Sequence, residues 1–306
     1  MKYYLGVDGG GTKTEAVIVN ERGELIERRI VGSSNPNDIG KKNMLDMLCA
    51  LVREMLPDNA AVLDIGMGLS GLSFSGCKDE LTAALQRMDK VGTVDVCSDV
   101  QIALDSAYDE DGCIAITGTG SVGYLRKNGE HILVGGGGYM IDSSFSGYDL
   151  GREVLNAALS ELDGRGEKTK ITALVLQKAG LAMGKIVKTA YVKGKAYVAS
   201  FAPVLFEAYE QGDLVAEGIL KRRMAELEIL LWGVYKRYGQ PRCEITLFGG
   251  LNRRVVELLR FFSAELQEKI SIVLPKYPVV CGALKRVCGV ANEEFLTVFL
   301  AGYRVV

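Results

Sequence analysis

The residues best suited to chemistry lie in the opening stretch of the chain, between two short apolar segments. Asp8 ends the first segment, and three glycines (Gly9 to Gly11), Thr12 and Lys13 follow it. A glycine backbone admits a ligand close to the main chain because no Cβ stands in the way. Consecutive N–H groups at such a tip form a nest for an anion. A carboxylate beside that nest suits a Mg²⁺-nucleotide, because Mg²⁺ keeps several waters and takes few protein ligands.

The common phosphate motifs do not fit this stretch. A P-loop requires Gly-Lys-Ser/Thr at the start of a helix, whereas Gly11 is followed by Thr12, Lys13 and a second apolar segment. A dinucleotide fingerprint also requires a helix after its glycines. Two interpretations therefore stay open for the stretch alone: a phosphate-binding hairpin or an ordinary glycine-rich turn.

A second acidic residue, Asp99, stands where a strand expected over 93–97 gives way to a helix over 100–107. Ser98 suits the N-cap position of that helix. The helix dipole stabilises an exposed carboxylate in the first turn by about 0.3–1 kcal/mol. From this dipeptide alone, Asp99 is either a capping acid or a functional carboxylate.

Hydrophobic periodicity predicts the elements that must position these residues. The pattern of the first hundred residues is βββαβαβ, which is typical of a mixed sheet with helical crossovers. Its strands are expected over 3–7, 16–19, 25–31, 61–67 and 93–97, and its helices over 41–56 and 78–88. Later elements are expected as helices within 149–159, 171–238, 253–267, 281–288 and 293–300, and as strands over 244–248 and 269–274.

The opening hairpin pattern recurs about 110 residues later. A strand over 113–117 leads into Gly118-Thr119-Gly120-Ser121, and strands over 121–126 and 131–134 follow. Two glycine hairpins in the same strand context imply a duplicated fold with a nucleotide held between its halves.

Composition narrows the class of protein. The 306 residues suffice for two domains, and 48% hydrophobic with 24% charged residues indicates a globular chain. The net charge of −2 argues against nucleic-acid partners, and no apolar run reaches membrane-spanning length. With no visible leader and seven scattered cysteines, we expect a cytoplasmic protein with free thiols. The single histidine, His131, argues against histidine triads and multi-histidine metal sites.

Several motifs, in order from residue 6 to 284, together resemble the actin-like ATPase superfamily of sugar kinases, Hsp70 and actin. Within it the chain is similar to the N-acetylglucosamine kinase and BadF/BadG/BcrA/BcrD ATPase group. The motifs are Asp8–Thr14, Ser98-Asp99, Gly118–Ser121, Gly135–Tyr139, Ser146–Arg152, Leu247–Gly250 and Pro278–Leu284.

The resemblance implies an α/β fold of two RNase H-like domains with ATP in a cleft between them. The first domain would span residues 1–110, joined by a C-terminal helix within 291–306, and the second residues 111–290 with a helical insertion. Asp8 would hold Mg²⁺ through water, and Asp99 would be the general base for an acceptor hydroxyl.

The resemblance also implies two further sets of site residues. Those for ATP are Gly9, Gly10, Gly11, Thr12, Lys13, Gly118, Thr119, Gly120, Gly249 and Gly250. Those for a sugar-like acceptor are Asn35, Ser70, Ser121, Asp142 and Ser143. From local chemistry alone, Asn35 is equally well an Asn-Pro turn residue.

The chain departs from the kinases of this group in the acceptor region. Gly137 stands where they carry a tryptophan, and Ser143 and Ser144 stand where they carry two acids. A stacking aromatic and a bidentate acceptor for sugar hydroxyls are therefore missing, although Asp142 is one position away. We expect weak or no phosphorylation of N-acetylglucosamine itself.

Three functions remain open from the sequence. The first is an ATP-dependent kinase for an amino sugar or related hydroxyl compound, acting as a homodimer. The second is a divergent ATP-binding protein without sugar kinase activity, which the Ser143-Ser144 change favours. The third is a BadF-type ATPase that holds an iron–sulfur cluster between subunits. Cys97 and Cys113 are the nearest candidates for it, but neither has cluster-type spacing.

Overall fold

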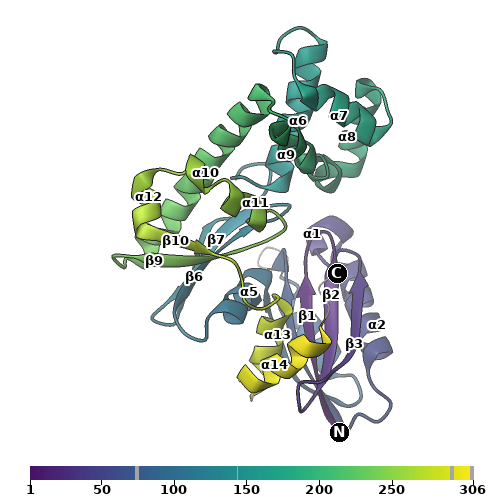
Figure 1. Ribbon diagram of the computed structural model, residues 1–306. Helices are drawn as coiled ribbons and strands as arrows, with labels where there is room; N and C mark the ends of the chain where they lie inside the picture. Colours follow the sequence, from purple (N-terminus) through teal and green to yellow (C-terminus); the bar gives the residue numbers. More distant parts are fainter. Residues whose placement is uncertain (73–75, 143, 290–292, 304–306) are drawn as a thin grey trace. The chain divides into compact units, whose positions relative to one another are not determined.

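The computed structural model describes residues 1–72, 76–142, 144–289 and 293–303, which form two compact units. Unit 1 comprises Met1–Glu110 and Lys276–Val306, and unit 2 comprises Asp111–Pro275. Figure 1 labels the elements of both units. No helix in the described residues is both long and apolar enough to cross a membrane.

Unit 1 contains a five-stranded sheet in the order β3-β2-β1-β4-β5. The first three strands are antiparallel neighbours, whereas β4 and β5 run parallel to β1. The strands are β1 (Lys2–Gly9), β2 (Thr14–Asn20), β3 (Leu25–Val31), β4 (Val62–Leu69) and β5 (Val91–Ser98). The helices are α1 (Pro36–Ile39), α2 (Lys41–Met55), α4 (Lys78–Gln86), α5 (Asp99–Ala107), α13 (Val280–Val287) and α14 (Glu293–Gly302).

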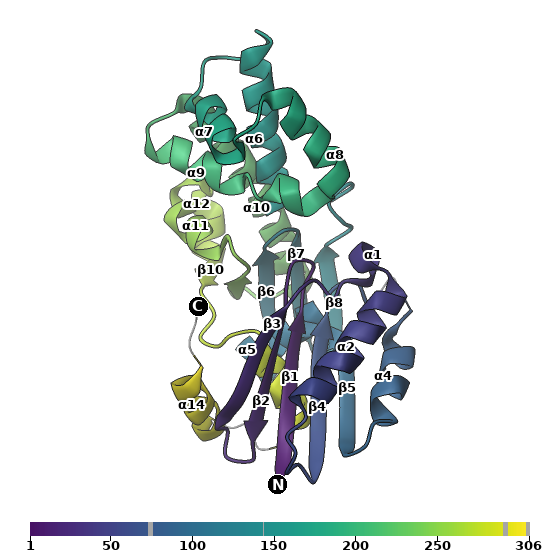
Figure 2. The ribbon, with the colours of Figure 1, turned by 90° about the vertical axis from the view of Figure 1, so that its right-hand side faces the viewer.

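Helices cover both faces of this sheet because side chains alternate along each strand. Leu5 and Val7 of β1 pack with residues of α2 and α4, which lie in front of the sheet in Figure 2. Tyr4 points to the opposite face and packs with α13 and α14. There α13 lies directly on the sheet, since a Cβ on Gly66 would clash with the Ala283 carbonyl.

The second domain boundary expected from the sequence, after residue 290, differs from this division. Helix α13 packs on β1, β4 and α5, so it lies with unit 1. Its position in the chain, directly after the last strand of unit 2, does not reveal this packing.

Unit 2 repeats the topology of unit 1, with a sheet in the order β10-β9-β6-β7-β8. Again three antiparallel strands come first, and the later strands run parallel to the first of them. The strands are β6 (Gly112–Thr117), β7 (Ser121–Lys127), β8 (Glu130–Gly135), β9 (Cys243–Phe248) and β10 (Ile270–Val273). The predicted α/β class and the duplicated sheet are therefore confirmed.

A group of helices lies between β8 and β9 in the chain and packs into the core of unit 2. They are α6 (Gly147–Leu162), α7 (Lys170–Ala179), α8 (Met183–Ala199), α9 (Ala202–Glu210) and α10 (Leu214–Tyr238).

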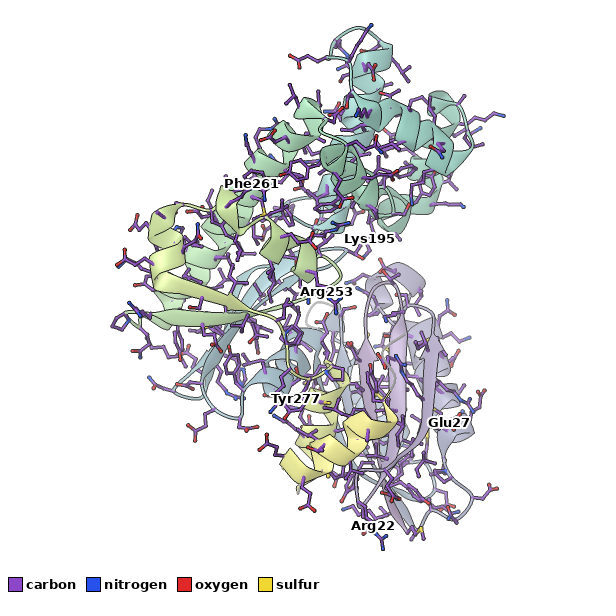
Figure 3. The ribbon with its side chains drawn as sticks, in the orientation of Figure 1. Arg22, Glu27, Lys195, Arg253, Phe261 and Tyr277 are labelled. Carbon is purple, nitrogen blue, oxygen red and sulfur yellow. The ribbon has the colours of Figure 1, made fainter. Side chains whose placement is uncertain are left out.

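The helix predicted over 253–267 is wrong as one element. The chain there forms α11 (Asn252–Glu257), a 3-10 turn (Leu259–Phe261) and α12 (Ala264–Lys269). Ser263 starts α12 as its N-cap, because its Oγ accepts from the Leu266 N–H at 3.2 Å. Phe261, labelled in Figure 3, packs against the Arg260 guanidinium. The distance from Arg260 Cζ to the centre of the Phe261 ring is 5.1 Å.

Candidate active site

The carboxyl ends of three parallel strands meet at one edge of the unit 1 sheet. Gly9 of β1 pairs with Leu69 of β4, and Leu69 pairs with Ser98 of β5. Asp8 and Asp99 are neighbours of the first and last of these residues, so both acids lie at this edge. Ligands of open α/β sheets bind outside the carboxyl ends of the strands.

Alternation along β1 also turns Asp8 toward α5. Asp8 shares a face of the strand with Tyr4 and Gly6, and this face is the one that α13 covers. Helix α5 contacts β1 and α13, and Asp99 is its first residue. The two carboxylates therefore interact, and the negative charge of Asp99 disfavours ionisation of Asp8.

Both acids have perturbed pKa values. Burial, followed by the charges of Asp99 and Glu15, raises the pKa of Asp8 to about 7, although Lys13 lowers it. Burial also raises the pKa of Asp99 to about 6, against the Val100 N–H that donates to its Oδ1 at 3.0 Å. A nearby cation would stabilise the ionised form of such poorly solvated carboxylates.

The two carboxylates suit Mg²⁺, because Mg²⁺ binds few protein ligands and retains several waters. Among the described residues, no group of three or more His, Cys, Asp or Glu side chains could hold a metal ion. A metal enclosed entirely by protein ligands is therefore not built into this part of the chain, whereas a mostly hydrated ion at Asp8 is compatible with it.

Glu15 stands directly opposite Asp8 in the β1–β2 register but is already engaged. Arg28 pairs with its Oε1 at 2.7 Å, and the Tyr303 hydroxyl donates to the same oxygen at 2.6 Å. Because its carboxylate already pairs with Arg28 and accepts from Tyr303, Glu15 is not a further candidate ligand.

The loop after β3 and the turn after β4 are both fastened to the glycine hairpin. The Ser34 N–H and the Ser33 hydroxyl each donate to the Gly10 carbonyl at 3.3 Å. On the other side, the Ser70 N–H donates to the Gly9 carbonyl at 2.7 Å. The hairpin, the loop and the turn thus form one hydrogen-bonded array.

Three hydroxyl groups in this array are buried without a hydrogen-bond partner in the described part of the chain: Thr14 Oγ1, Ser34 Oγ and Ser70 Oγ. A buried hydroxyl without a partner costs about 1–3 kcal/mol. Ser34 occupies the space of a Cβ on Gly9, which explains why Gly9 carries no side chain. Sequence reasoning identified Ser70 but missed Ser34, whose only signal was its place in a polar loop.

The second glycine hairpin is held by the first turn of α6. The Gly118 N–H closes the hairpin by donating to the Gly120 carbonyl at 2.9 Å. The N–H groups of Gly147 and Tyr148 donate to the carbonyls of Gly118 and Thr119 at 2.7 and 3.2 Å. These helix N–H groups are therefore spent on positioning the hairpin rather than on a ligand.

The two glycines after β9 differ in their surroundings. Gly249 has a φ of +94°, and its Cα faces the hairpin: an added Cβ would clash with the Thr117 carbonyl and lie 2.9 Å from the Gly118 N. Among the described residues, no atom outside its chain neighbours lies within 4 Å of a Cβ built on Gly250. Gly249 therefore serves packing within unit 2, whereas the position of Gly250 is open in the described part of the chain.

Two residues of unit 2 predicted to bind the acceptor sugar have side chains that accept hydrogen bonds from backbone N–H groups of the same unit. Ser121 Oγ accepts from the Ser144 N–H at 2.9 Å, and Asp142 Oδ2 accepts from the Gly137 N–H at 3.2 Å. Both hold the segment after β8. Ser143, also predicted to bind the acceptor, lies outside the described residues.

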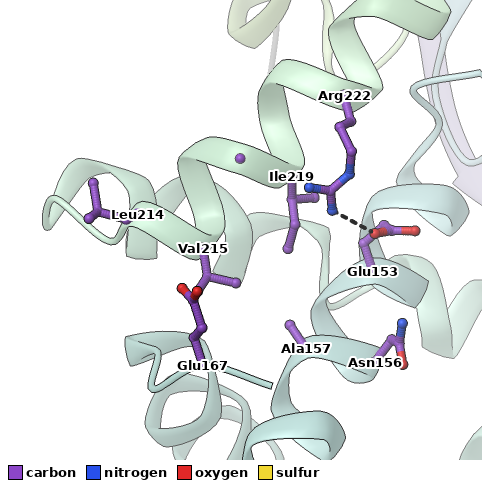
Figure 4. A pocket seen from close by; sticks show the side chains of 9 residues that line it. Glu153, Asn156, Ala157, Glu167, Leu214, Val215, Ile219 and Arg222 are labelled. Carbon is purple, nitrogen blue, oxygen red and sulfur yellow. Dashed lines mark ion pairs between the residues drawn. The ribbon is translucent and has the colours of Figure 1, made fainter. Parts of the chain in front are cut away.

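A pocket of about 390 Å³ lies elsewhere in unit 2, between α6 and α10 (Figure 4). Glu153, Ile219 and Arg222 are part of its lining, and Glu153 pairs with Arg222 at 3.6 Å. None of the predicted site residues lines it.

The cysteines weighed for an iron–sulfur cluster are core residues. Cys97 is buried within unit 1, and Cys113 within the core of unit 2. A buried thiol behaves as a small hydrophobic side chain. All seven cysteines are free and buried.

Comparison with known proteins gives concordant results over nearly the whole chain. The N-acetylmuramic acid/N-acetylglucosamine kinase of Clostridium acetobutylicum is 30% identical over 291 residues, covering 92% of this chain and 94% of its own. The glucosamine kinase of Vibrio cholerae is 27% identical, with 93% and 95% covered. A crystal structure assigned as an N-acetylglucosamine kinase from Chromobacterium violaceum superposes with a TM-score of 0.76 at 25% identity, covering 93% and 98%.

One family model spans both units. The model of the BadF/BadG/BcrA/BcrD ATPase family matches residues 5–285, a range that includes both glycine hairpins, both acids and Gly249-Gly250. The chain therefore belongs to the BadF/BadG/BcrA/BcrD ATPase family.

Proposed function

We propose that the protein transfers the γ-phosphoryl group of ATP to a hydroxyl of an amino sugar, with Mg²⁺ as the metal. The observation that carries this proposal is the pair of poorly solvated acids, Asp8 and Asp99, at the carboxyl ends of β1 and β5. Support comes from relatives named as amino-sugar kinases that match more than 90% of the chain.

The two acids have different tasks in this proposal. Asp8 would hold Mg²⁺ through water, and the ion would supply positive charge against the phosphates. Asp99 would accept the proton of the acceptor hydroxyl. The hydroxyl oxygen would then bond to the γ-phosphorus of ATP while the bond to ADP breaks and ADP leaves. Phosphoryl transfer depends mainly on positioning and electrostatics. A positioned general base contributes about 10²–10⁴-fold to the rate of such a step.

The glycine turns and polar loops would bind the two substrates. For ATP we propose the same hairpin residues as the resemblance implies, and Gly250 rather than Gly249 as the position with room for the nucleotide. For the acceptor we propose Asn35, Ser70, Ser121, Asp142 and Ser143. The free, buried cysteines support a reducing compartment. We propose that the protein acts in the cytoplasm as a homodimer.

ADP release with a panel of acceptors tests the function. The panel holds N-acetylmuramic acid, N-acetylglucosamine and glucosamine, with glucose as a hexose lacking the amino group. At least one amino sugar is expected to turn over at about 1–100 s⁻¹. N-acetylglucosamine itself is expected to be phosphorylated weakly or not at all, because Gly137 and Ser144 offer it neither an aromatic face nor a carboxylate. Release at the acceptor-free rate with every sugar would contradict the proposal.

Gly120→Val is expected to weaken ATP binding at least about tenfold, comparable to losing one hydrogen bond to a charged group. No atom of another described residue lies within 4 Å of a Cβ at this position, so folding should persist while the side chain fills space near the hairpin. Gly184→Val on α8, equally open, is the matched control. Calorimetry that gives equal ATP affinity for Gly120→Val and wild type would remove this hairpin from the site.

A further inference from the structure

Asn35 is the proposed acceptor residue whose geometry is best defined. It is 8% exposed, and its Oδ1 accepts from the Asn37 N–H at 2.9 Å, which makes it the N-cap of α1. Its Nδ2 group forms no hydrogen bond to another residue among those the structure describes. The capping bond therefore fixes the plane of the amide and leaves an NH₂ donor for another partner.

Gly71, in the turn after β4, packs directly against this amide. Its φ is +76°, a conformation that side chains rarely adopt. A Cβ on Gly71 would clash with Asn35 Oδ1 and lie 2.9 Å from Asn35 Cγ and 2.8 Å from Asn37 Nδ2. The space beside the amide is therefore available only while residue 71 is glycine.

Both sides of this contact are anchored to the first glycine hairpin. The Asn35 N–H donates to Ser33 Oγ at 3.1 Å, and that hydroxyl donates to the Gly10 carbonyl at 3.3 Å. Ser70, the neighbour of Gly71, donates its N–H to the Gly9 carbonyl. The position of the amide relative to the hairpin is thus set from both directions.

We propose that Gly71 is a positioning residue for the acceptor. It holds the Asn35 amide so that Nδ2 donates a hydrogen bond to a hydroxyl of the acceptor sugar. This role rests on the proposed function, and Gly71 acts through Asn35 because it offers no side chain of its own.

Gly71→Ala tests the role, with Gly76→Ala as matched control. Gly76 also has a positive φ, of +61°, but no atom of another described residue lies within 4 Å of a Cβ built on it, so its variant experiences similar backbone strain without touching Asn35. Gly71→Ala is expected to raise the acceptor KM by about 3- to 10-fold, as for one neutral hydrogen bond, with kcat and ATP affinity unchanged. Gly76→Ala is expected to keep the wild-type KM. Equal KM values for the two variants would overturn the proposal.

A double-mutant cycle adds a readout that a purely structural role would not move. Because Gly71 acts through Asn35, Gly71→Ala should add no further KM increase to an Asn35→Ala protein. Effects that multiply would overturn the role.

The orientation of the amide can also be followed without any acceptor. In ¹⁵N–¹H spectra, the side-chain NH₂ signals of Asn35 are expected to shift in Gly71→Ala and to hold in Gly76→Ala. Unshifted signals in Gly71→Ala would overturn the positioning role. Shifted signals combined with a negative acceptor panel would support the positioning of Asn35 and reject only the kinase function.

Discussion

Asp99→Asn is expected to lower kcat by about 10²–10⁴-fold, or roughly 3–5 kcal/mol of barrier, in a protein that still folds. Asparagine is nearly isosteric and can orient a hydroxyl, but it accepts a proton poorly. ATP affinity should survive, because the proposed phosphate contacts lie on the glycine turns. The measurement is kcat with the best acceptor, alongside calorimetry with ATP.

The surroundings of Asp99 allow this substitution to be separated from a loss of fold. Ser98 is the N-cap of α5, and Gln101 Oε1 accepts from its N–H at 3.0 Å. The Asp99 carboxylate accepts from the Val100 N–H, a bond that an asparagine oxygen can also accept. A variant that melts normally and keeps full turnover would show that Asp99 only supports the helix start.

The pH dependence has a definite sign. Burial raises the pKa of Asp99 from 3.8 to about 6, so the folded protein binds the proton more tightly than the unfolded chain. The stability from this group is fully present below pH 3.8 and is lost as the pH rises through about 6. At pH 7 Asp99→Asn should therefore melt no lower than wild type. A base must be unprotonated, so wild-type kcat/KM should fall as the pH drops through about 6.

Gly249→Ala is expected to destabilise the protein by about 3–5 kcal/mol, since it combines a strained backbone with a steric clash. The φ of +94° disfavours any side chain, and the methyl group would strike the Thr117 carbonyl and crowd the Gly118 N. Because these are backbone atoms, no side-chain rotation can relieve the contact. The melting temperature should fall by about 10 °C or more.

Gly250→Ala is the matched control for this prediction. It changes the next residue in the same turn, where a methyl group would meet no atom of another described residue within 4 Å. It should melt like wild type and affect only nucleotide binding. A Gly249→Ala protein with the melting temperature of Gly250→Ala would show that the close approach of Gly249 to the hairpin does not constrain the fold.

The sequence by itself determined the α/β class, the duplicated sheet and the family. These depend on local signals, because strand and helix periods appear within short windows and glycine turns mark the hairpins. The acids Asp8 and Asp99 were also identifiable as candidates, since each stands where a strand ends. Which chemistry they perform stays a prediction until the substitutions are measured.

Only the tertiary structure decided the contacts between distant parts of the chain. Glu15 is engaged by Tyr303, 288 residues away, and α13 lies on the unit 1 sheet although it follows the last strand of unit 2. Likewise, the meeting of Gly71 with Asn35 follows from strand order and from bonds to the hairpin. No local pattern encodes such contacts, because they form only when the closed fold brings separate segments together.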